Sequence, residues 1–186
     1  MKRSLYLTLI PLAIAAAAAP ASAQQGFALK GHYIFNESTA DDASTDNIPV
    51  EDGIGAGVEY VFPFGLGVGV SAYTGEGVDE FDVETTEVTV LGEANYFLSI
   101  PILPVSPYVG VHAGVGNFDR EALESNPEFE LQDDSRTQLG WQIGVRFQPI
   151  PLLGIDAQYR RMSTSAAEGQ DEGLERNQFL VGITLF

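Results

Sequence analysis

The 186-residue sequence predicts an all-β fold, an eight-stranded antiparallel up-and-down transmembrane β-barrel that follows a cleaved signal peptide. Three observations predict this fold. Eight segments of about ten residues alternate apolar and polar side chains, which is the length and period of a tilted strand that crosses a hydrocarbon layer. The connections between these segments alternate between long, polar stretches and short, proline-rich ones. Nearly all acidic residues fall in the long connections.

The N-terminus has the order of a secretory leader. Lys2 and Arg3 precede an apolar stretch, which ends in Pro20-Ala21-Ser22-Ala23. Small residues at positions 21 and 23 fit a signal peptidase, so cleavage after Ala23 is expected. Residues 1–23 are then the signal peptide and residues 24–186 one outer-membrane β-barrel domain. An anchor helix is the alternative, but the stretch is short for a bilayer about 30 Å thick and contains Pro11.

Charge and composition exclude several classes of protein. Once the leader is removed, seven basic residues stand against 26 acidic ones, a formal net charge of −19, which disfavours nucleic acid as a partner. The chain has no cysteine, which suits a barrel whose strand ladders close on themselves. No later apolar stretch approaches the length of a membrane helix, so membrane crossing has to use strands. No cofactor and no resident metal are expected.

The first three expected strands are residues 26–36, 53–62 and 66–74. Each has an apolar face and a face of glycine or polar residues, among them Lys30, His32 and Glu59. A tight turn at Pro63-Phe64-Gly65 joins the second to the third. Their outward faces carry Phe27, Leu29, Tyr33, Phe35, Ile54, Ala56, Val58, Tyr60, Phe62, Leu66, Val68, Val70 and Ala72.

The fourth and fifth strands are expected at residues 84–98 and 108–118. Between them lies Ile100-Pro101-Ile102-Leu103-Pro104, where prolines prevent further ladder pairing. Glu93 and His112 have inward parity. The outward positions are Val88, Val90, Ala94, Tyr96, Val109, Val111, Ala113 and Val115.

The last three strands are expected at residues 138–147, from 153 to 160, and from 176 to the end, with Pro149-Ile150-Pro151 in the turn after the sixth. Arg146, Asp156 and Arg160 have inward parity. The outward positions are Leu139, Trp141, Ile143, Val145, Phe147, Leu153, Ile155, Ala157, Tyr159, Phe179, Val181, Ile183 and Leu185.

The connections indicate which end of the barrel faces outward. Residues 37–52, 75–84, 119–135 and 163–175 are long and polar, whereas 63–65, 99–107 and 149–152 are short. Outer-membrane barrels have long external loops and short periplasmic turns. Of the 26 acids, 23 lie in or beside the long connections. The sequence therefore predicts a monomer in the outer membrane of a Gram-negative-type bacterium, with both termini on the periplasmic side.

In strand number, loop alternation, polar interior and terminal Phe186, the mature chain resembles the OmpA/OmpX class of small outer-membrane barrels. The resemblance implies an integral outer-membrane barrel without a catalytic motif, with the barrel-assembly machinery as its partner during insertion. One feature departs from the family. Phe186 shares its parity with Thr184 and Gly182 rather than with the apolar set, so we expect either an offset by a bulge or a weaker insertion signal.

Seven titratable side chains form a predicted interior cluster. A buried charge is costly alone and much less so when paired, and register brings Lys30 beside Glu59, Arg146 opposite Asp156, and Glu93 near His112. Eight strands enclose an interior just wide enough for side chains, so a plug is expected, with a gated ion path as the alternative. The members are Lys30, Glu59, Glu93, His112, Arg146, Asp156 and Arg160.

Catalysis is disfavoured by the residues around His112. With Glu93 it could form a base and its orienting carboxylate, but this arrangement needs a nucleophile. Small outer-membrane lipid deacylases carry His-x-Ser, whereas here Ala113-Gly114 follows the histidine. Ser71, the one serine with inward parity on the expected strands, belongs to another strand.

The outer end carries the candidates for contact with lipopolysaccharide. Carboxylates bind divalent cations, and Asp41-Asp42, Asp133-Asp134 and Asp171-Glu172 could bridge to lipopolysaccharide phosphates, although none has EF-hand spacing. Arg161, outward near the outer end of strand seven, is the candidate for direct phosphate contact, with snorkelling to the interface as the alternative.

The leading hypothesis is a non-enzymatic outer-membrane barrel whose acidic loops act in envelope integrity or surface interaction, with outer-membrane lipids and lipopolysaccharide as partners. The alternatives are a small channel for ions or apolar molecules and a lipid-modifying enzyme. A soluble lipocalin-like barrel would need an apolar interior, which is the inverse of this pattern.

Overall fold

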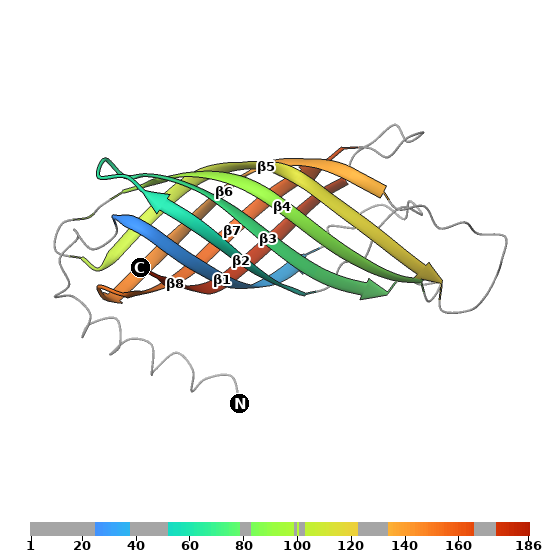
Figure 1. Ribbon diagram of the computed structural model, residues 1–186, viewed down its shortest axis with the longest axis horizontal. Coiled ribbons are helices and arrows are strands. Elements are labelled where there is room, and N and C mark those ends of the chain that lie inside the picture. Colours follow the sequence, from blue (N-terminus) through green and yellow to red (C-terminus); the bar gives the residue numbers. More distant parts are fainter. Residues whose placement is uncertain are drawn as a thin grey trace, which may run out of the picture.

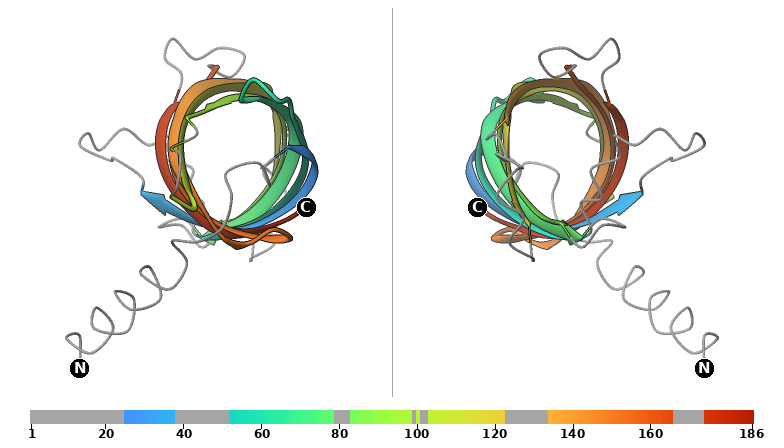
Figure 2. Two further views of the ribbon diagram at one scale, coloured as in Figure 1. Left: turned by 90° about the vertical axis from the view of Figure 1, so that its left-hand side faces the viewer. Right: turned by 90° about the vertical axis from the view of Figure 1, so that its right-hand side faces the viewer.

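The computed structural model describes residues 25–37, 52–78, 83–98, 100, 103–122, 134–165 and 174–186. Each strand pairs antiparallel with the next, and the last pairs with the first, so the sheet closes into a barrel (Figure 1). The end-on views in Figure 2 show the closed ring. The strands are β1 (Gly26–Glu37), β2 (Gly53–Val61), β3 (Leu66–Val78), β4 (Val83–Phe97), β5 (Val105–Ala122), β6 (Asp134–Ile150), β7 (Leu153–Thr164) and β8 (Leu174–Leu185).

The two ends of the barrel differ in their connections. Residues 62–65, 98–104 and 151–152 join strands at one end, the short-turn end, where the C-terminus also lies (Figure 1). The β2–β3 turn is tight because Gly65 adopts a φ of 89°, a left-handed conformation that glycine accepts without strain. The connections at the other end, the long-loop end, fall between β1 and β2, β3 and β4, β5 and β6, and β7 and β8.

Several predicted strand ends were too short. Residues 75–84 were expected as a loop, but β3 runs to Val78 and β4 begins at Val83, with Glu76 paired to Thr86. β5 extends at both ends, from Val105 to Ala122, and β6 starts at Asp134. Pairing depends on backbone groups alone, so the ladder continues past the apolar band into residues whose polarity indicated a loop.

The predicted facing of the strands is confirmed. Outward apolar side chains are exposed, as at Leu29 and Val111, while their neighbours along the strand are buried, as at Lys30 and His112. No helix in the described part of the chain is long and apolar enough to cross a membrane. The predicted signal peptide, Asp41-Asp42, Asp133 and Asp171-Glu172 lie outside the described residues.

Candidate functional site

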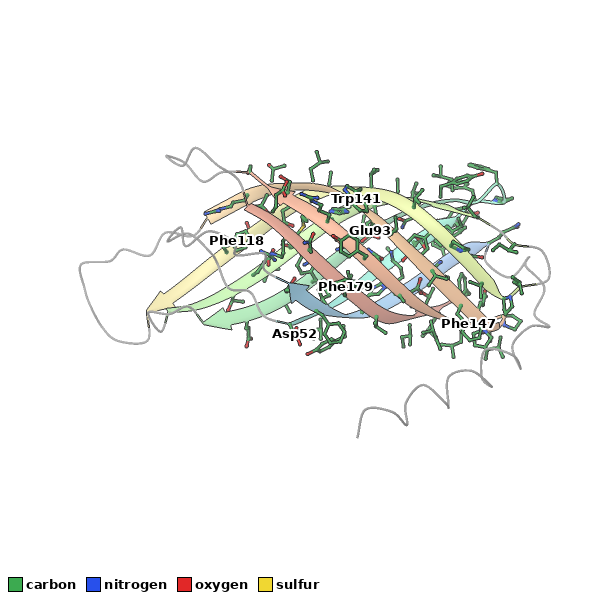
Figure 3. All side chains as sticks on the ribbon, turned by 180° about the vertical axis from the view of Figure 1, so that it is seen from behind. Asp52, Glu93, Phe118, Trp141, Phe147 and Phe179 are labelled. Atoms are coloured by element: carbon green, nitrogen blue, oxygen red, sulfur yellow. The ribbon has the colours of Figure 1, made fainter. Side chains whose placement is uncertain are left out.

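The barrel interior holds the buried polar side chains, so it is the candidate site. All seven residues of the predicted cluster are buried, including Glu59, Arg146 and Asp156 at 1% exposure or less. Figure 3 shows Glu93 in the middle of the barrel, between Phe147 near the short-turn end and Phe118 toward the long-loop end.

Six of these residues form one chain of alternating charge. Arg146 Nε donates to Asp156 Oδ1 at 2.8 Å, and Arg146 Nη2 lies 2.9 Å from Glu59 Oε2. Lys30 Nζ is 3.8 Å from Glu59 Oε1 and 2.7 Å from Glu93 Oε2. Arg160 Nη2 ends the series at 2.9 Å from Glu93 Oε1. We call this set the charge chain: Asp156, Arg146, Glu59, Lys30, Glu93 and Arg160.

The strand register explains which ions meet. Arg146 and Asp156 face each other directly across β6 and β7. Lys30 pairs with Gly57 rather than Glu59, because the β1–β2 register is shifted by two residues from the expected one. Lys30 therefore reaches across the lumen to Glu93, which is its nearer partner. Glu93 does face His112 across β4 and β5, but its hydrogen bonds go elsewhere.

A neutral polar group donates a hydrogen bond to each carboxylate of the charge chain. Asn95 Nδ2 donates to Glu59 Oε1 at 3.0 Å, and Ser71 Oγ donates to Glu93 Oε1 at 2.5 Å. Thr184 Oγ1 donates to Asp156. A buried carboxylate is tolerated when its lone pairs are filled in this way, so each acid of the chain has at least two partners.

The short-turn end of the lumen is closed by aromatic rings. The guanidinium of Arg146 lies 4.7 Å from the ring centroid of Phe97 and 5.6 Å from that of Phe186, a cation–π contact on each side. Val61 and Tyr108 complete the apolar cluster with Phe97. Phe186 thus follows the inward parity of Thr184 without a bulge in β8, and its unusual parity places its ring beneath the charge chain.

An apolar layer crosses the interior, which sequence reasoning missed because it expected a wholly polar lumen. We call it the apolar belt: Ile34, Tyr73, Leu91, Met162 and Leu180, each at most 5% exposed. It lies between the charge chain and the long-loop end. Each of these residues has the inward parity of its strand. Strict alternation of side chains along a strand therefore predicts that all five face the lumen.

A second ion pair lies on the far side of the apolar belt. Arg176 Nη1 is paired with Glu87 Oε2, and Glu87 Oε1 accepts from Thr89 Oγ1 at 2.8 Å and Gln138 Nε2 at 2.9 Å. Tyr73 Oη donates to the same oxygen at 3.3 Å. We call Glu87 and Arg176 the upper pair. Glu87 is one of the 23 acids counted in or beside the long connections, and its expected place among the solvated loop acids is wrong: it shares the parity of Glu93 and is fully buried.

The geometry around His112 offers no catalytic dyad. Neither ring nitrogen has a hydrogen-bond partner, and Ser71 donates to Glu93 instead. Ser106 is a second buried inward serine, which the prediction missed because β5 begins earlier than expected. Within the described residues, no group of three or more His, Cys, Asp or Glu could hold a metal ion.

Arg161 lies on the outer wall, as its parity predicted, but it already has an anionic partner. Its Nη2 is paired with Glu175 Oε2 on β8, and both side chains are about half exposed. Tyr159 Oη donates to Asn177 Oδ1 at 2.8 Å beside this pair. Trp141 is the register partner of Arg161 on β6, and its ring centroid lies 5.7 Å from that of Tyr159, so aromatic residues neighbour the pair.

Comparison with known proteins identifies the same architecture elsewhere. A family model described as "Outer membrane protein beta-barrel domain" matches residues 7–185. Neisserial surface protein A is similar at 15% identity and a TM-score of 0.66, over 87% of this chain and 97% of that chain. The attachment invasion locus protein Ail of Yersinia pestis is similar at 20% identity and a TM-score of 0.58, over 87% and 98%.

OprG of Pseudomonas aeruginosa is similar at 14% identity and a TM-score of 0.55, over 90% of this chain and 98% of that chain. Ail has also been determined in complex with the heparin analogue sucrose octasulfate. No curated protein sequence matches the chain. At these identities the solved structures establish the fold alone.

Proposed function

Because the chain belongs to the outer membrane protein β-barrel domain family, we propose that it is a closed, non-enzymatic barrel whose acidic loops act in envelope integrity or surface interaction. The protein resides in the outer membrane of a Gram-negative-type bacterium, as its family and structural neighbours do. The observation that carries the proposal is the charge chain, in which three acids and three bases neutralise one another across the lumen.

A closed lumen follows from how these groups are held. A conducting pore needs water and mobile ions along its axis, whereas here the charged groups bind one another at 2.7 to 2.9 Å at four of five contacts. The apolar belt adds a second barrier, since an ion that passes it must shed water without polar replacement. The interior cavity beside His32 and Arg160 is about 10 Å³, room for roughly one water molecule.

Planar-bilayer recording tests the closed lumen. The purified, refolded mature protein is expected to show no unitary conductance at voltages where a porin control conducts. A strain that lacks the protein is expected to become more sensitive to detergents and bulky antibiotics, and Arg146→Ala, if folded, should restore resistance less well than the wild type. Steady single-channel currents from the wild-type protein would overturn the proposal.

A small channel is the second candidate, because some interior polar atoms lack protein partners. Both ring nitrogens of His112 and Arg146 Nη1 are buried without a hydrogen bond. Buried polar atoms of this kind are commonly satisfied by water, so the lumen can be hydrated locally. Under this alternative, disruption of the charge chain opens a conductance and leaves folding nearly intact.

The surface partners remain part of the proposal. Lipopolysaccharide and other outer-membrane lipids surround the wall, divalent cations can bridge lipid phosphates to loop carboxylates, and the barrel-assembly machinery inserts the chain. The Arg161–Glu175 pair weakens the case for direct phosphate contact, because the guanidinium must leave its carboxylate to bind an anion. The same pair has to open before Glu175 can bind a bridging cation.

A further inference from the structure

The short-turn end carries exposed apolar side chains where a turn in water would carry polar ones. Phe64 and Leu152, at the tips of two turns, are 64% and 66% exposed. The connection between β4 and β5 contributes three more exposed apolar side chains. We call the set the apolar rim: Phe64, Leu98, Ile100, Leu103, Ile150 and Leu152.

The rim is free of charge along the sequence that forms it. Residues 60–75, 94–118 and 147–155 contain no Asp, Glu, Lys or Arg. The charged residues nearest this end, such as Glu59, Arg146 and Asp156, are buried in the lumen. Turns that project into water or lie at a lipid headgroup region usually carry charged side chains, so the absence of Asp, Glu, Lys and Arg here indicates an apolar surrounding.

Two features of the rim backbone favour a hydrocarbon environment: few N–H donors, and turn hydrogen bonds. Irregular backbone is excluded from lipid unless its polar groups are satisfied internally or missing. Six of the ten prolines, residues without a backbone N–H, fall within 63–65, 99–107 and 149–152. Several N–H donors at this end bond across the turns: Phe62 N to Leu66 O at 2.8 Å, Gly65 N to Phe62 O at 2.9 Å, and Gln148 N to Pro104 O at 2.7 Å.

The rim is also continuous with the lipid-facing wall. Ring centroids follow one another at 4.9 Å from Phe27 to Tyr60, 4.9 Å from Tyr60 to Phe62, and 5.4 Å from Phe62 to Phe64. These rings run from the wall between β1 and β2 onto the turn without a polar interruption. The surface that contacts lipid along the wall therefore extends over the edge of the barrel.

We propose that the short-turn end is embedded in the membrane, with its apolar rim covered by the phospholipid acyl chains of the periplasmic leaflet. The barrel then ends inside the bilayer rather than in the periplasm. Its contacts with soluble partners are restricted to the long-loop end. This placement does not depend on whether the lumen conducts.

Depth-dependent quenching tests the placement directly, since the chain has no cysteine to compete with a label. Phe64→Cys and Leu152→Cys carry a polarity-sensitive fluorophore after refolding into phosphatidylcholine vesicles. Ala113→Cys, outward on the wall, and Ser165→Cys, exposed at the long-loop end, are the matched references. Quenchers are lipids brominated on their acyl chains, and iodide on both sides of the bilayer. Heat-modifiable gel mobility verifies folding of each variant.

Labels at positions 64 and 152 are expected to behave like the label at 113, quenched by brominated lipid and protected from iodide. Iodide quenching comparable to that at position 165 would overturn the proposal. The vesicles contain this chain alone, so a rim that a protein partner covers in the cell would be open to iodide here and would give that contrary result.

A measurement without a label provides a second test. Leu152→Asp is expected to slow folding into vesicles severalfold, because the carboxylate must enter the acyl region, whereas Ser163→Asp, outward near the long-loop end, should fold at the wild-type rate. Equal folding rates for the two variants would contradict an embedded rim.

Discussion

Acids are paired with bases at two sites in the lumen, and the two sites differ in how their members are connected. In the charge chain every internal member bridges two partners of opposite sign, so six residues from β1, β2, β4, β6 and β7 act together. The upper pair joins Glu87 on β4 to Arg176 on β8, and hydroxyl and amide groups supply further contacts to Glu87. The apolar belt separates the two sites.

This difference predicts which of the two sites contributes more to the stability of the barrel. Removal of one ion from the charge chain leaves an uncompensated charge among groups that already bind each other. Removal of one ion from the upper pair leaves the other beside hydroxyl and amide groups, nearer the long-loop end. The cost of a substitution should therefore fall from the charge chain, through the apolar belt, to the upper pair and finally to the outer wall.

The largest effect is expected for Arg146→Ala. The change removes the partner of both Asp156 and Glu59, and it leaves Phe97 and Phe186 without the cation between them. Loss of one member of a buried ion pair typically costs about 3 to 5 kcal/mol. Urea unfolding in lipid vesicles measures the change in the free energy of unfolding.

Asp156→Asn combined with Arg146→Ala is the matched control for this substitution. If the charge chain acts as one network, the double variant should be destabilised by less than the sum of the two single variants, because no uncompensated carboxylate remains at position 156. Additive losses would contradict a connected network. Unchanged stability with a new conductance in either single variant would favour the channel.

The next effect in size is expected for Leu91→Ala in the apolar belt. Leu91 is fully buried against the belt, and truncation of a buried leucine costs about 2 to 5 kcal/mol. Val90→Ala, on the neighbouring outward position, is the matched control and should cost less because lipid fills the space. Equal losses at the two positions would show that the belt is not packed. The same unfolding assay applies.

Parity in the sequence indicates which residues of the charge chain face the lumen, but most of their contacts and the layers beyond them were not predicted, for a physical reason. Residues such as Lys30, Arg146 and Asp156 lie where side chains alternate clearly between apolar and polar, so parity identifies their direction. Contacts across the lumen cannot be identified from parity alone. Lys30 binds Glu93, 63 residues away, because barrel closure and strand shear bring β1 and β4 together, and neither can be read from one hairpin.

Toward the long-loop end the alternation of polarity fails as a signal. Beside Arg176 both strand faces carry polar residues, and beyond Val88 the outward face of β4 becomes polar at Thr86. A carboxylate at position 87 then looks like one more loop acid, although the strand pairs Glu87 with Gly75 and Phe118. The apolar belt was missed for a different reason. The expected pattern places polar residues inside the barrel, so apolar residues with inward parity were not read as a layer.

A moderate effect is expected for Arg176→Ala in the upper pair. Glu87 loses its cation but keeps Thr89 and Gln138 as donors, so the cost should be about 1 to 3 kcal/mol, typical of a lost hydrogen bond to a charged group. Glu87→Gln/Arg176→Ala, which removes both charges, should recover part of that loss. A cost for Arg176→Ala as large as that of Arg146→Ala would remove the distinction between the two sites.

The smallest effect is expected for Arg161→Ala on the outer wall. The Arg161–Glu175 pair is half exposed at the edge of the barrel, where solvent screens ion pairs and they contribute little to stability. The free energy of unfolding should therefore be nearly unchanged, and Glu175→Gln should behave alike.

The informative measurement for this pair is binding of lipopolysaccharide with and without magnesium. If Arg161 contacts phosphate directly, Arg161→Ala weakens binding under both conditions. If a cation bridges phosphate to Glu175, Glu175→Gln weakens only the magnesium-dependent part. Unaltered binding by both variants would exclude this pair from lipopolysaccharide recognition and leave the acidic loops as the remaining surface.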